Sequence, residues 1–395
     1  MRELKILDRK SILFKSDIET VSGNLNNIIS ESSFLVVGGG GTIGQATVKE
    51  IFIRNPKKLL VVDISENNLV ELVRDLRSTH GYIDGEFDTF ALDCGSEEFE
   101  RLYRSKGPFD YVLNLSALKH VRSEKDEYTL KRMVDVNIKN SIQIQKLAEE
   151  YNARKLFCVS TDKAANPANM MGASKRIMEI FLQHNSKNVP VSMARFANVA
   201  FSDGSLLHGF ISRVRKQQPI SAPNDTKRYF ITEKEAGRLC MMSTIFGKHN
   251  QIFFPNQSGE IFLQKFVDIA SRFLRDMGLE PKVFATENEA RRAISEIDLD
   301  TYWPCYFFKS DTTGEKPYEE FYTSDEEVDN NRFSEIGIIN LRKGPRRMNY
   351  DEFIHEIDCL WDTGKWTKEH LVQLFHMMLP NFEHIETGKN LNQKM

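Results

Sequence analysis

Cysteine is scarce in this chain: its 395 residues include five, an odd number, and none stand at the paired spacing of a metal site. We therefore expect no disulfide framework and no metal, and a reducing, cytoplasmic setting. Long apolar runs are also missing, so the sequence predicts neither a membrane span nor a signal peptide. The net charge of −3 lacks the basic excess typical of nucleic-acid-binding proteins, which argues against a nucleic-acid partner.

The chain does have the composition of a globular protein, with 41% hydrophobic and 28% charged residues. From residue 34 to residue 196, apolar strand-like runs alternate with helical patterns at the spacing of βαβ units. The alternation predicts an α/β fold, a Rossmann-type doubly wound parallel sheet with helices on both faces. The expected divisions are an N-terminal flank (1–30), the domain of the main sheet (31–197), a smaller α/β substrate domain (198–340) and a C-terminal helical extension (341–395). We expect the extension, with its basic turn at 342–347, to contact a second copy of the chain.

A glycine-rich loop follows the first predicted strand and opens a helix, with Gly38, Gly41 and Gly44 three residues apart. Glycines in this context allow a tight turn and let backbone N–H groups approach a pyrophosphate at the helix N-terminus. Asp63 ends the next strand, where a carboxylate hydrogen-bonds a ribose diol and repels a 2′-phosphate. Asp93, which is expected to end the third strand, is placed to meet the adenine. The pattern predicts a dinucleotide site for NAD rather than NADP.

A second polar segment follows the strand at 155–159. Thr161, Asp162 and Lys163 come in succession at its carboxyl edge, where open α/β sheets place their chemistry. Lys175 is expected to begin the next helix, which keeps apolar residues at helical spacing. The segment on its own is either a polar loop between a strand and a helix or a site at which a hydroxyl, a carboxylate and an amine act together.

Together these motifs resemble the extended short-chain dehydrogenase/reductase superfamily, and within it the polysaccharide-biosynthesis branch that contains the UDP-N-acetylglucosamine 4,6-dehydratases. The resemblance covers roughly residues 5–340. The matching segments are Gly38–Gly44, Asn114–Val121, Asn137, Ser160–Pro167, Met171–Arg176, Arg195–Val199, Ser202–Ser205 and Gly314–Lys316. One departure is Met171, which stands where the superfamily has a tyrosine that takes the hydroxyl proton. The large dehydratases of the branch share this methionine, and a thioether cannot act as the base.

The resemblance implies an internal redox elimination on a bound sugar nucleotide. Lys163 is expected to act as base with a lowered pKa, and Asp162 as acid with a raised one, although each charge pulls the other the opposite way. Thr161 is expected to contact sugar O4, and Lys175 to hold the nicotinamide ribose. The implied cofactor-binding residues are Gly38, Gly41, Thr42, Ile43, Gly44, Asp63, Asp93, Ser116, Ala117, Asn137 and Lys175. The implied substrate-binding residues are Lys119, His120, Asn198, Arg228 and Glu315.

The leading hypothesis is therefore an NAD-dependent 4,6-dehydratase of a nucleotide-linked N-acetylglucosamine, with UDP favoured over GDP, that serves surface glycan synthesis. One alternative is a 4- or 5-epimerase of the same branch, which begins with the same oxidation or enolisation but does not eliminate water from the sugar. Another is a non-catalytic dinucleotide-binding sensor. The sequence leaves open the stereochemistry at C5 and the group that deprotonates the C4 hydroxyl.

Overall fold

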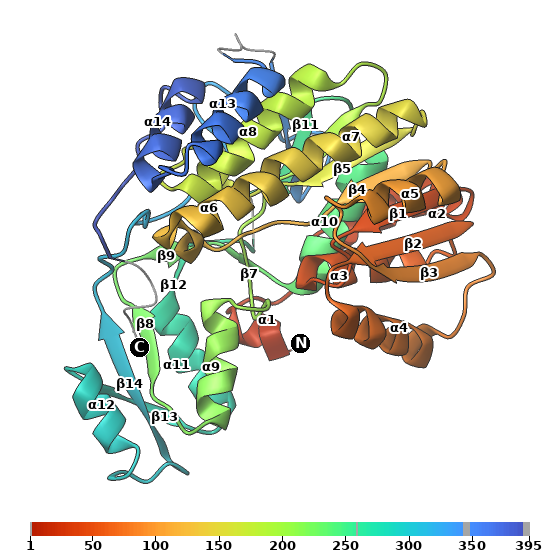
Figure 1. Ribbon diagram of the computed structural model, residues 1–395. Coiled ribbons are helices and arrows are strands. Elements are labelled where there is room, and N and C mark those ends of the chain that lie inside the picture. Colours follow the sequence, from red (N-terminus) through yellow and green to blue (C-terminus); the bar gives the residue numbers. More distant parts are fainter. Residues whose placement is uncertain (1, 258–259, 343–347, 390–395) are drawn as a thin grey trace.

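The structure, a computed structural model, describes residues 2–257, 260–342 and 348–389. Its main feature is a nine-stranded sheet with the order β15-β16-β11-β6-β5-β4-β1-β2-β3 (Figure 1). The strands from β3 to β11 in this order are parallel, and β16 and β15 join the β11 edge antiparallel. The bounds are β1 Ser33–Val37, β2 Lys58–Asp63, β3 Glu86–Ala91, β4 Tyr111–Asn114, β5 Lys155–Val159, β6 Val191–Ala194, β11 Gln251–Pro255, β15 Glu327–Asp329 and β16 Ile336–Asn340.

The strand order confirms the predicted doubly wound sheet. From β1 the chain winds outward through β2 and β3, then returns to β4 on the other side of β1 and continues through β5 and β6. Helices α3 and α10 pack together on one face, and α7 and α8 on the other (Figure 1). Because winding reverses between β1 and β4, a crevice opens there at the carboxyl ends of the strands. The helices of this lobe are α3 Thr42–Phe52, α4 Glu66–His80, α5 Glu97–Lys106, α6 Glu127–Val134, α7 Asn140–Glu150, α8 Met170–Asn185 and α10 Glu233–Phe246.

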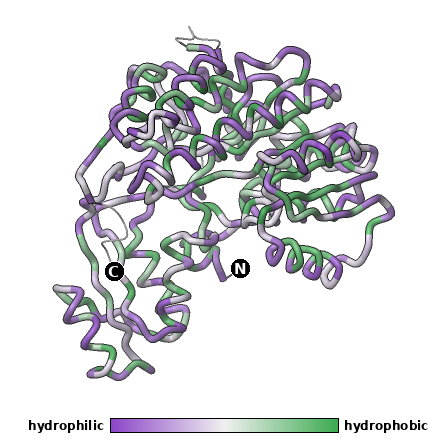
Figure 2. Tube along the Cα trace, in the orientation of Figure 1, coloured by the Kyte–Doolittle hydropathy of each residue, from purple (hydrophilic) through white to green (hydrophobic). Residues whose placement is uncertain are grey.

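A second, smaller lobe has its own three-stranded parallel sheet, in the order β13-β14-β8. Its core is separate from that of the main sheet and includes Phe210, Ile269 and Cys305. In Figure 2 the apolar residues of each lobe line its interior. The elements of the second lobe are β8 Ile220–Pro223, β13 Glu280–Phe284, β14 Tyr302–Phe308, α9 Leu206–Arg215, α11 Phe266–Asp276 and α12 Glu287–Ala293. Helix α1 Arg2–Ile6 packs against α11. Two short ladders join the lobes: β7 Asn198–Val199 with β10 Phe230–Ile231, and β9 Lys227–Arg228 with β12 Gln264–Lys265.

The chain crosses between the lobes more than once. Three strands beyond residue 197, namely β11, β15 and β16, belong to the large sheet, so the segment 198–340 contributes to both lobes. The predicted domain boundaries themselves stay predictions. In the C-terminal extension, α13 Tyr350–Asp362 packs on α14 Lys368–Met378, and α14 packs on α8 (Figure 1). The basic turn at 343–347 lies outside the described residues. Among the helices of the described part, none combines the length and apolar character needed to cross a membrane.

The N-terminal flank is anchored by charged side chains. Arg9 is buried in an ion pair with Glu235 of α10. The flank's main helix is α2 Lys15–Ser30, and its Asp17 accepts hydrogen bonds from the backbone N–H groups of Ser334 and Glu335, at distances of 2.7 and 2.8 Å. Residues more than 300 positions apart in the sequence therefore meet beside the large sheet.

Two element ends differ from the sequence prediction. Helix α8 begins at Met170, so the expectation that Lys175 begins it is wrong. The cause is Asn169, whose side chain accepts a hydrogen bond from the N–H of Gly172 at 2.8 Å and caps the helix earlier. Lys175 consequently lies inside the helix and is 3% exposed. The third strand ends at Ala91, two residues before Asp93.

Candidate active site

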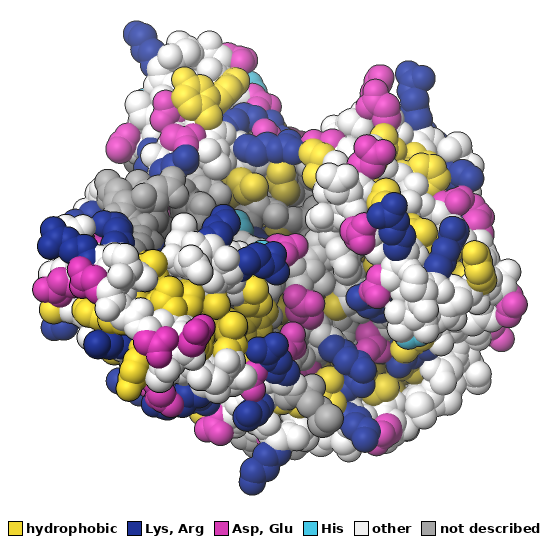
Figure 3. All heavy atoms as spheres, turned by 90° about the horizontal axis from the view of Figure 1, so that it is seen from below, with side chains coloured by type: hydrophobic (Ala, Val, Ile, Leu, Met, Phe, Trp, Pro, Cys, Tyr) yellow, Lys and Arg dark blue, Asp and Glu magenta, His cyan; other side chains and the backbone are white. Residues whose placement is uncertain are grey.

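A cavity of about 1080 Å³ lies between the carboxyl ends of the large sheet and the second lobe. The molecule is hollowed between its lobes on the face seen in Figure 3. Sites for a single small molecule measure about 300–1,000 Å³, so this volume is large enough for more than one ligand. Of the predicted site residues, the following line the cavity: Gly38, Gly41, Thr42, Ile43, Gly44, Asp63, Asp93, Ser116, Ala117, Lys119, His120, Thr161, Asp162, Lys163, Met171, Lys175, Asn198 and Glu315. Asn137 and Arg228 are not among the residues that line it.

The glycine loop is shaped for a ligand that approaches the backbone closely. Gly38 has a φ of +77°, and a Cβ there would lie 2.5 Å from the backbone nitrogen of Ser116. A Cβ on Gly44 would lie 2.1 Å from the carbonyl oxygen of Gly38. Gly41 is the N-cap of α3 and has no side chain to cover the helix N-terminus. The loop therefore leaves the positive end of α3 open to the cavity, where a pyrophosphate of NAD fits.

The two carboxylates beside this loop are fixed by hydrogen bonds. Asp63 accepts from the N–H groups of Gly40 and Ser65, both at 2.9 Å, which holds its carboxylate at the end of β2 on the cavity wall. Asp93 accepts from the N–H of Gly95 and pairs with Arg132, both at 2.9 Å. Burial pushes the pKa of Asp93 upward, but these two partners outweigh it and lower the pKa below its ordinary value. The residues present fit the adenosine half of NAD, and Asp63 disfavours a 2′-phosphate.

The fit of the loop is testable with Gly44→Ala. The added methyl group meets backbone atoms that cannot rotate away, so the loop must shift and NAD affinity is expected to fall by on the order of tenfold or more. Titration calorimetry with NAD measures the change. Gly23→Ala on α2 is the matched control, because a Cβ there meets nothing within 4 Å. An unchanged NAD affinity in Gly44→Ala would show that the dinucleotide binds elsewhere.

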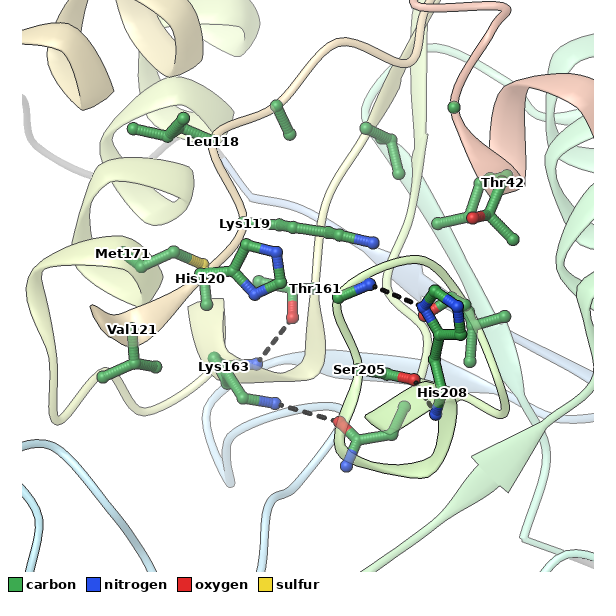
Figure 4. A pocket seen from close by; sticks show the side chains of 18 of the residues that line it. Thr42, Leu118, Lys119, His120, Val121, Thr161, Lys163, Met171, Ser205 and His208 are labelled. Atoms are coloured by element: carbon green, nitrogen blue, oxygen red, sulfur yellow. Dashed lines mark hydrogen bonds between the residues drawn. The ribbon is translucent and has the colours of Figure 1, made fainter. Parts of the chain in front are cut away.

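The acid–base pair forms one turn after β5, in the short helix η3 Asp162–Ala164. Oδ1 of Asp162 accepts from the Thr161 hydroxyl at 2.9 Å, from the Lys163 backbone N–H at 2.9 Å and from Lys163 Nζ at 3.0 Å. No described side chain or backbone group donates to Oδ2, which is the oxygen left for a substrate. The Lys163 amine also lies 3.5 Å from Oδ1 of Asn198 (Figure 4). The structure thus brings together the hydroxyl, carboxyl group and amine predicted from the sequence.

The charge of Lys163 differs from the expectation. Burial works against that charge, yet the carboxylates of Asp162 and Glu319 outweigh burial and raise the pKa of Lys163 above its ordinary value. Glu319, which the sequence analysis missed, is 4% exposed and lies 3.9 Å from Lys163 Nζ. The expectation of a lowered pKa at Lys163 is therefore wrong, and in the resting pair Lys163 carries the proton. Glu319 lies three residues after the matched segment Gly314–Lys316, and this proximity is the signal by which the sequence could have identified it.

The second lysine of the cavity behaves in the opposite way. Lys175 Nζ donates to the carbonyl oxygen of Val159 at 3.1 Å, and burial lowers the pKa of Lys175 to about 8. Met171 lies one turn earlier on α8, is 3% exposed and lines the cavity. Of Lys163 and Lys175, Lys175 is thus the amine with the lowered pKa, and burial also lowers the pKa of Lys119 on the same cavity.

The opposite wall comes from the segment that leads into α9 (Figure 4). Ser205 caps this helix by accepting from the N–H of His208 at 3.2 Å, and His208 accepts from the N–H of Gly204 at 3.2 Å. A Cβ on Gly204 would lie 2.9 Å from the ring of His120, so this turn packs directly on the predicted substrate residue. The N-terminus of α9 faces the cavity. His208 was missed by the sequence analysis, although Ser202–Ser205 carried the turn signal for the helix start.

Asn137 and Arg228 support the site from behind its walls. Asn137 is fully buried, accepts from the Leu118 N–H at 2.9 Å and donates to the Leu118 carbonyl at 3.1 Å and to Ser174 at 2.9 Å. It therefore holds the loop after β4 against α8. Arg228 is 3% exposed and binds Glu315, which itself lines the cavity. The predicted ligand contacts of these two residues stay predictions.

A buried ionic network fixes the loop that carries the pair. Arg195 is fully buried between Glu179 and Glu326, each 2.7 Å away. Glu179 also accepts from the Ser160 hydroxyl at 2.6 Å, directly before Thr161 in the chain. Burial pushes the pKa of Glu326 upward, but the guanidinium of Arg195 outweighs it and lowers the pKa to about 2. The network joins β5, β6, α8 and the segment before β15.

Comparisons with known proteins identify the family. The family model described as "Polysaccharide biosynthesis protein" matches residues 34–341, which is well over half of the chain. This chain belongs to that family. Its fold is that of the short-chain dehydrogenases/reductases, as predicted.

Relatives and solved structures agree with this assignment. The chain is 26% identical over 292 residues to the capsular polysaccharide biosynthesis protein CapD of Staphylococcus aureus, covering 71% of this chain but 48% of CapD. The chain thus spans about half the length of that relative. It is 26% identical over 249 residues to the inverting UDP-N-acetylglucosamine 4,6-dehydratase of Campylobacter jejuni serotype O:2, covering 60% of this chain and 68% of the relative.

Among solved structures, Pen from Bacillus thuringiensis superposes with a TM-score of 0.63 at 22% identity, covering 79% of this chain and 88% of Pen. A double mutant of DesIV, a dTDP-glucose 4,6-dehydratase from Streptomyces venezuelae with NAD bound, gives a TM-score of 0.54 at 14% identity, covering 73% of this chain and 87% of that one. UDP-glucose 4-epimerases are among the similar proteins as well. At these identities the structures show the shared fold.

Proposed function

We propose that this protein is an NAD-dependent nucleotide-sugar 4,6-dehydratase that converts a UDP-linked N-acetylglucosamine to its 4-keto-6-deoxy derivative. The observation that carries the proposal is the contact between Asp162 and Lys163, a carboxyl group and an amine 3.0 Å apart on the wall of a cavity with room for cofactor and substrate. The relative named as a UDP-N-acetylglucosamine 4,6-dehydratase supports this choice among the reactions of similar proteins.

The glycine loop, Asp63 and Asp93 would hold the adenosine half of NAD. NAD bound there would supply the oxidation at sugar C4 and the matching reduction at C6. The low pKa of Lys175, about 8, lets this amine lose a proton near neutral pH, which the Met171 thioether cannot do. Thr161 presents its hydroxyl on the cavity wall, where it can hydrogen-bond the C4 oxygen. We assign the proton of the C4 hydroxyl to the unprotonated Lys175 amine, so that Asp162 stays free to accept the C5 proton.

The elimination needs one group that accepts the C5 proton and one that protonates the C6 oxygen. In the resting pair Lys163 carries the proton, so we assign Oδ2 of Asp162 as the acceptor and Lys163 as the donor, the reverse of the expectation from the sequence. The C5–H bond breaks and its proton passes to Asp162, a C5–C6 double bond forms, and the C6–O bond breaks as Lys163 protonates the departing hydroxyl, which leaves as water. Transfer of the proton from Asp162 to Lys163, across their 3.0 Å contact, restores the pair. The reduction at C6 would be matched by return of a proton to C5, which balances the proton released from the C4 hydroxyl.

The nucleotide is proposed to bind along the second lobe. The N-terminus of α9 offers its positive dipole to a diphosphate, and His208 and Ser205 lie beside it on the cavity wall. Arg213, on the next turns of α9, also lines the cavity and is held by Ser221 of β8 at 3.0 Å. The wall continues to Phe308 of β14, an aromatic face suited to a base.

Product analysis tests the proposal. Incubation with UDP-N-acetylglucosamine, and with the GDP analogue in parallel, is expected to yield from the UDP compound a product lighter by one water, identified by mass spectrometry and NMR, with no net consumption of NAD. An isomer of unchanged mass would establish an epimerase, which the epimerase relatives make the second candidate. Binding of NAD without turnover of either compound would establish a non-catalytic sensor.

A substitution at Met171 tests whether this side chain only packs against its neighbours or also takes part in the reaction. Because its side chain is buried at 3% exposure and cannot transfer a proton, Met171→Leu is expected to keep activity within about fivefold, as a volume-conserving swap. The turnover rate with UDP-N-acetylglucosamine is the measurement. A loss of more than a hundredfold would give the thioether a direct part in the reaction.

A further inference from the structure

The end of the described chain crosses the junction of the two cavity walls. The segment Phe382–Lys389, here called the C-terminal strap, follows α14 and lies beyond the residues that the family model matches. The backbone N–H of Ile385 donates to the carbonyl oxygen of Ala168 at 3.0 Å, and its carbonyl accepts from the N–H of Gly314 at 2.8 Å. One strap residue thus contacts both the loop after the Asp162–Lys163 pair and the loop that carries Glu315.

On the side of the acid–base pair, the strap acts through His384. Its Nε2 donates to Glu124 at 3.0 Å, with the two side chains 7% and 3% exposed. The other carboxylate oxygen of Glu124 accepts from the backbone N–H of Met170 at 2.9 Å. Met170 is the first residue of α8, and the next residue, Met171, lines the cavity. His384 is therefore linked by two hydrogen bonds to the start of the helix that forms this wall.

On the opposite side, the strap binds the loop at 311–315. The Thr313 hydroxyl donates to Glu386 at 2.8 Å, and the Thr313 N–H donates to the carbonyl oxygen of Lys389 at 2.9 Å. Thr312 and Glu315, on either side of these contacts, line the cavity. Asn169 completes the junction, because its amide donates to the Gly314 carbonyl at 3.0 Å while its oxygen caps α8.

We propose that the C-terminal strap sets the distance between the two cavity walls, with His384 as the positioning residue on the catalytic side. Outside the C-terminal extension, the hydrogen bonds of the described strap residues go to Glu124, Ala168 and the loop at 311–314 and not to the glycine loop, Asp63 or Asp93, so the strap governs the nucleotide-sugar half of the cavity and not the NAD half. The inference rests on the proposed function only in the choice of a uridine nucleotide as ligand. A region outside the family match thereby becomes part of the substrate site.

The test compares binding of UDP and of NAD by calorimetry in four proteins, with one further variant as control: the unaltered chain, His384→Ala, His384→Gln and a chain ending at residue 381. In His384→Ala a buried acceptor on Glu124 loses its donor, so UDP affinity is expected to fall about tenfold or more while NAD affinity stays within about twofold. His384→Gln keeps an N–H donor and is expected to recover most of the loss. The control is His355→Ala, an exposed histidine on α13.

Hydrogen exchange of the backbone at 162–171 and 311–316 accompanies the titrations, and faster exchange in both segments is expected in His384→Ala and in the shortened chain. If UDP affinity and the rate of hydrogen exchange are both unchanged in these two variants, the proposal that the strap positions the cavity walls is wrong. An equal loss of UDP and NAD binding would also overturn it, because the effect would then be general instability. If the unaltered protein binds no UDP, the proposed function fails, and exchange alone then decides for or against the strap.

Discussion

Asp162→Asn and Lys163→Gln are each expected to lower the rate of dehydration by roughly 10²- to 10⁴-fold, the range for loss of a general acid or base. NAD affinity is expected to stay unchanged, because the pair lies apart from the glycine loop. The two variants should differ in one partial reaction. With Asp162 as the acceptor of the C5 proton, Lys163→Gln still exchanges C5 hydrogen with deuterated solvent, whereas Asp162→Asn does not. NMR of recovered substrate and intermediate measures the exchange.

The opposite pattern would restore the assignment first expected from the sequence. If Asp162→Asn exchanges deuterium at C5 and Lys163→Gln does not, the lysine is the base, and bound sugar must reverse the proton position of the resting pair. Glu319→Gln is the companion variant: it removes a carboxylate that raises the pKa of Lys163, so the pKa of the donor is expected to fall. The high-pH limb of the rate profile should then move to lower pH.

Glu179→Ala is expected to destabilise the fold by about 3–5 kcal/mol, the range for breaking a buried ion pair by removing one partner. Arg195, fully buried, would be left with Glu326 alone, and the Ser160 hydroxyl would lose its acceptor. Urea unfolding followed by circular dichroism measures the difference. Glu71→Ala in the exposed pair with Arg74 on α4 is the control, with an expected change within about 1 kcal/mol. If Glu179→Ala lowers the free energy of unfolding by no more than this control does, the buried ionic network does not stabilise the fold.

The same network predicts how stability depends on acid. The folded-state pKa of Glu326, about 2, lies below its ordinary value of 4.5, so the unfolded chain binds the proton more readily. The stabilising contribution of this carboxylate is therefore fully present above about pH 4.5 and is lost as the pH falls toward 2. Glu326→Gln should flatten this part of the curve of unfolding free energy against pH. An unchanged slope would contradict the lowered pKa.

The sequence predicted those parts of the fold that depend on contiguous segments. The strands from β1 to β6 are apolar runs with intervening helices, and the glycine loop and the Asp162–Lys163 pair are each formed by neighbouring residues. The addition of β11, β16 and β15 to the sheet depends on pairing between distant segments. A short apolar run such as Gln251–Pro255 carries no information about its partner strand.

The errors at the site have the same origin. The pKa of Lys163 depends on Glu319, which meets it only through the folded chain. Asn137 and Arg228 were assigned from a resemblance of motifs, which carries no information about their partners in the fold, Ser174 and Glu315. His384 gave no signal at all, because its partner Glu124 is brought to it by packing of the extension on the large lobe.

The most direct measurement uses UDP-N-acetylglucosamine carrying deuterium at C4, with NMR of the product. If the protein is the proposed dehydratase, the label appears at C6 of the 4-keto-6-deoxy sugar and the NAD pool stays undiminished. Return of the label to C4, with the C6 hydroxyl still present, would show that the same cavity and the same pair serve an epimerase, and the proposed function would be wrong.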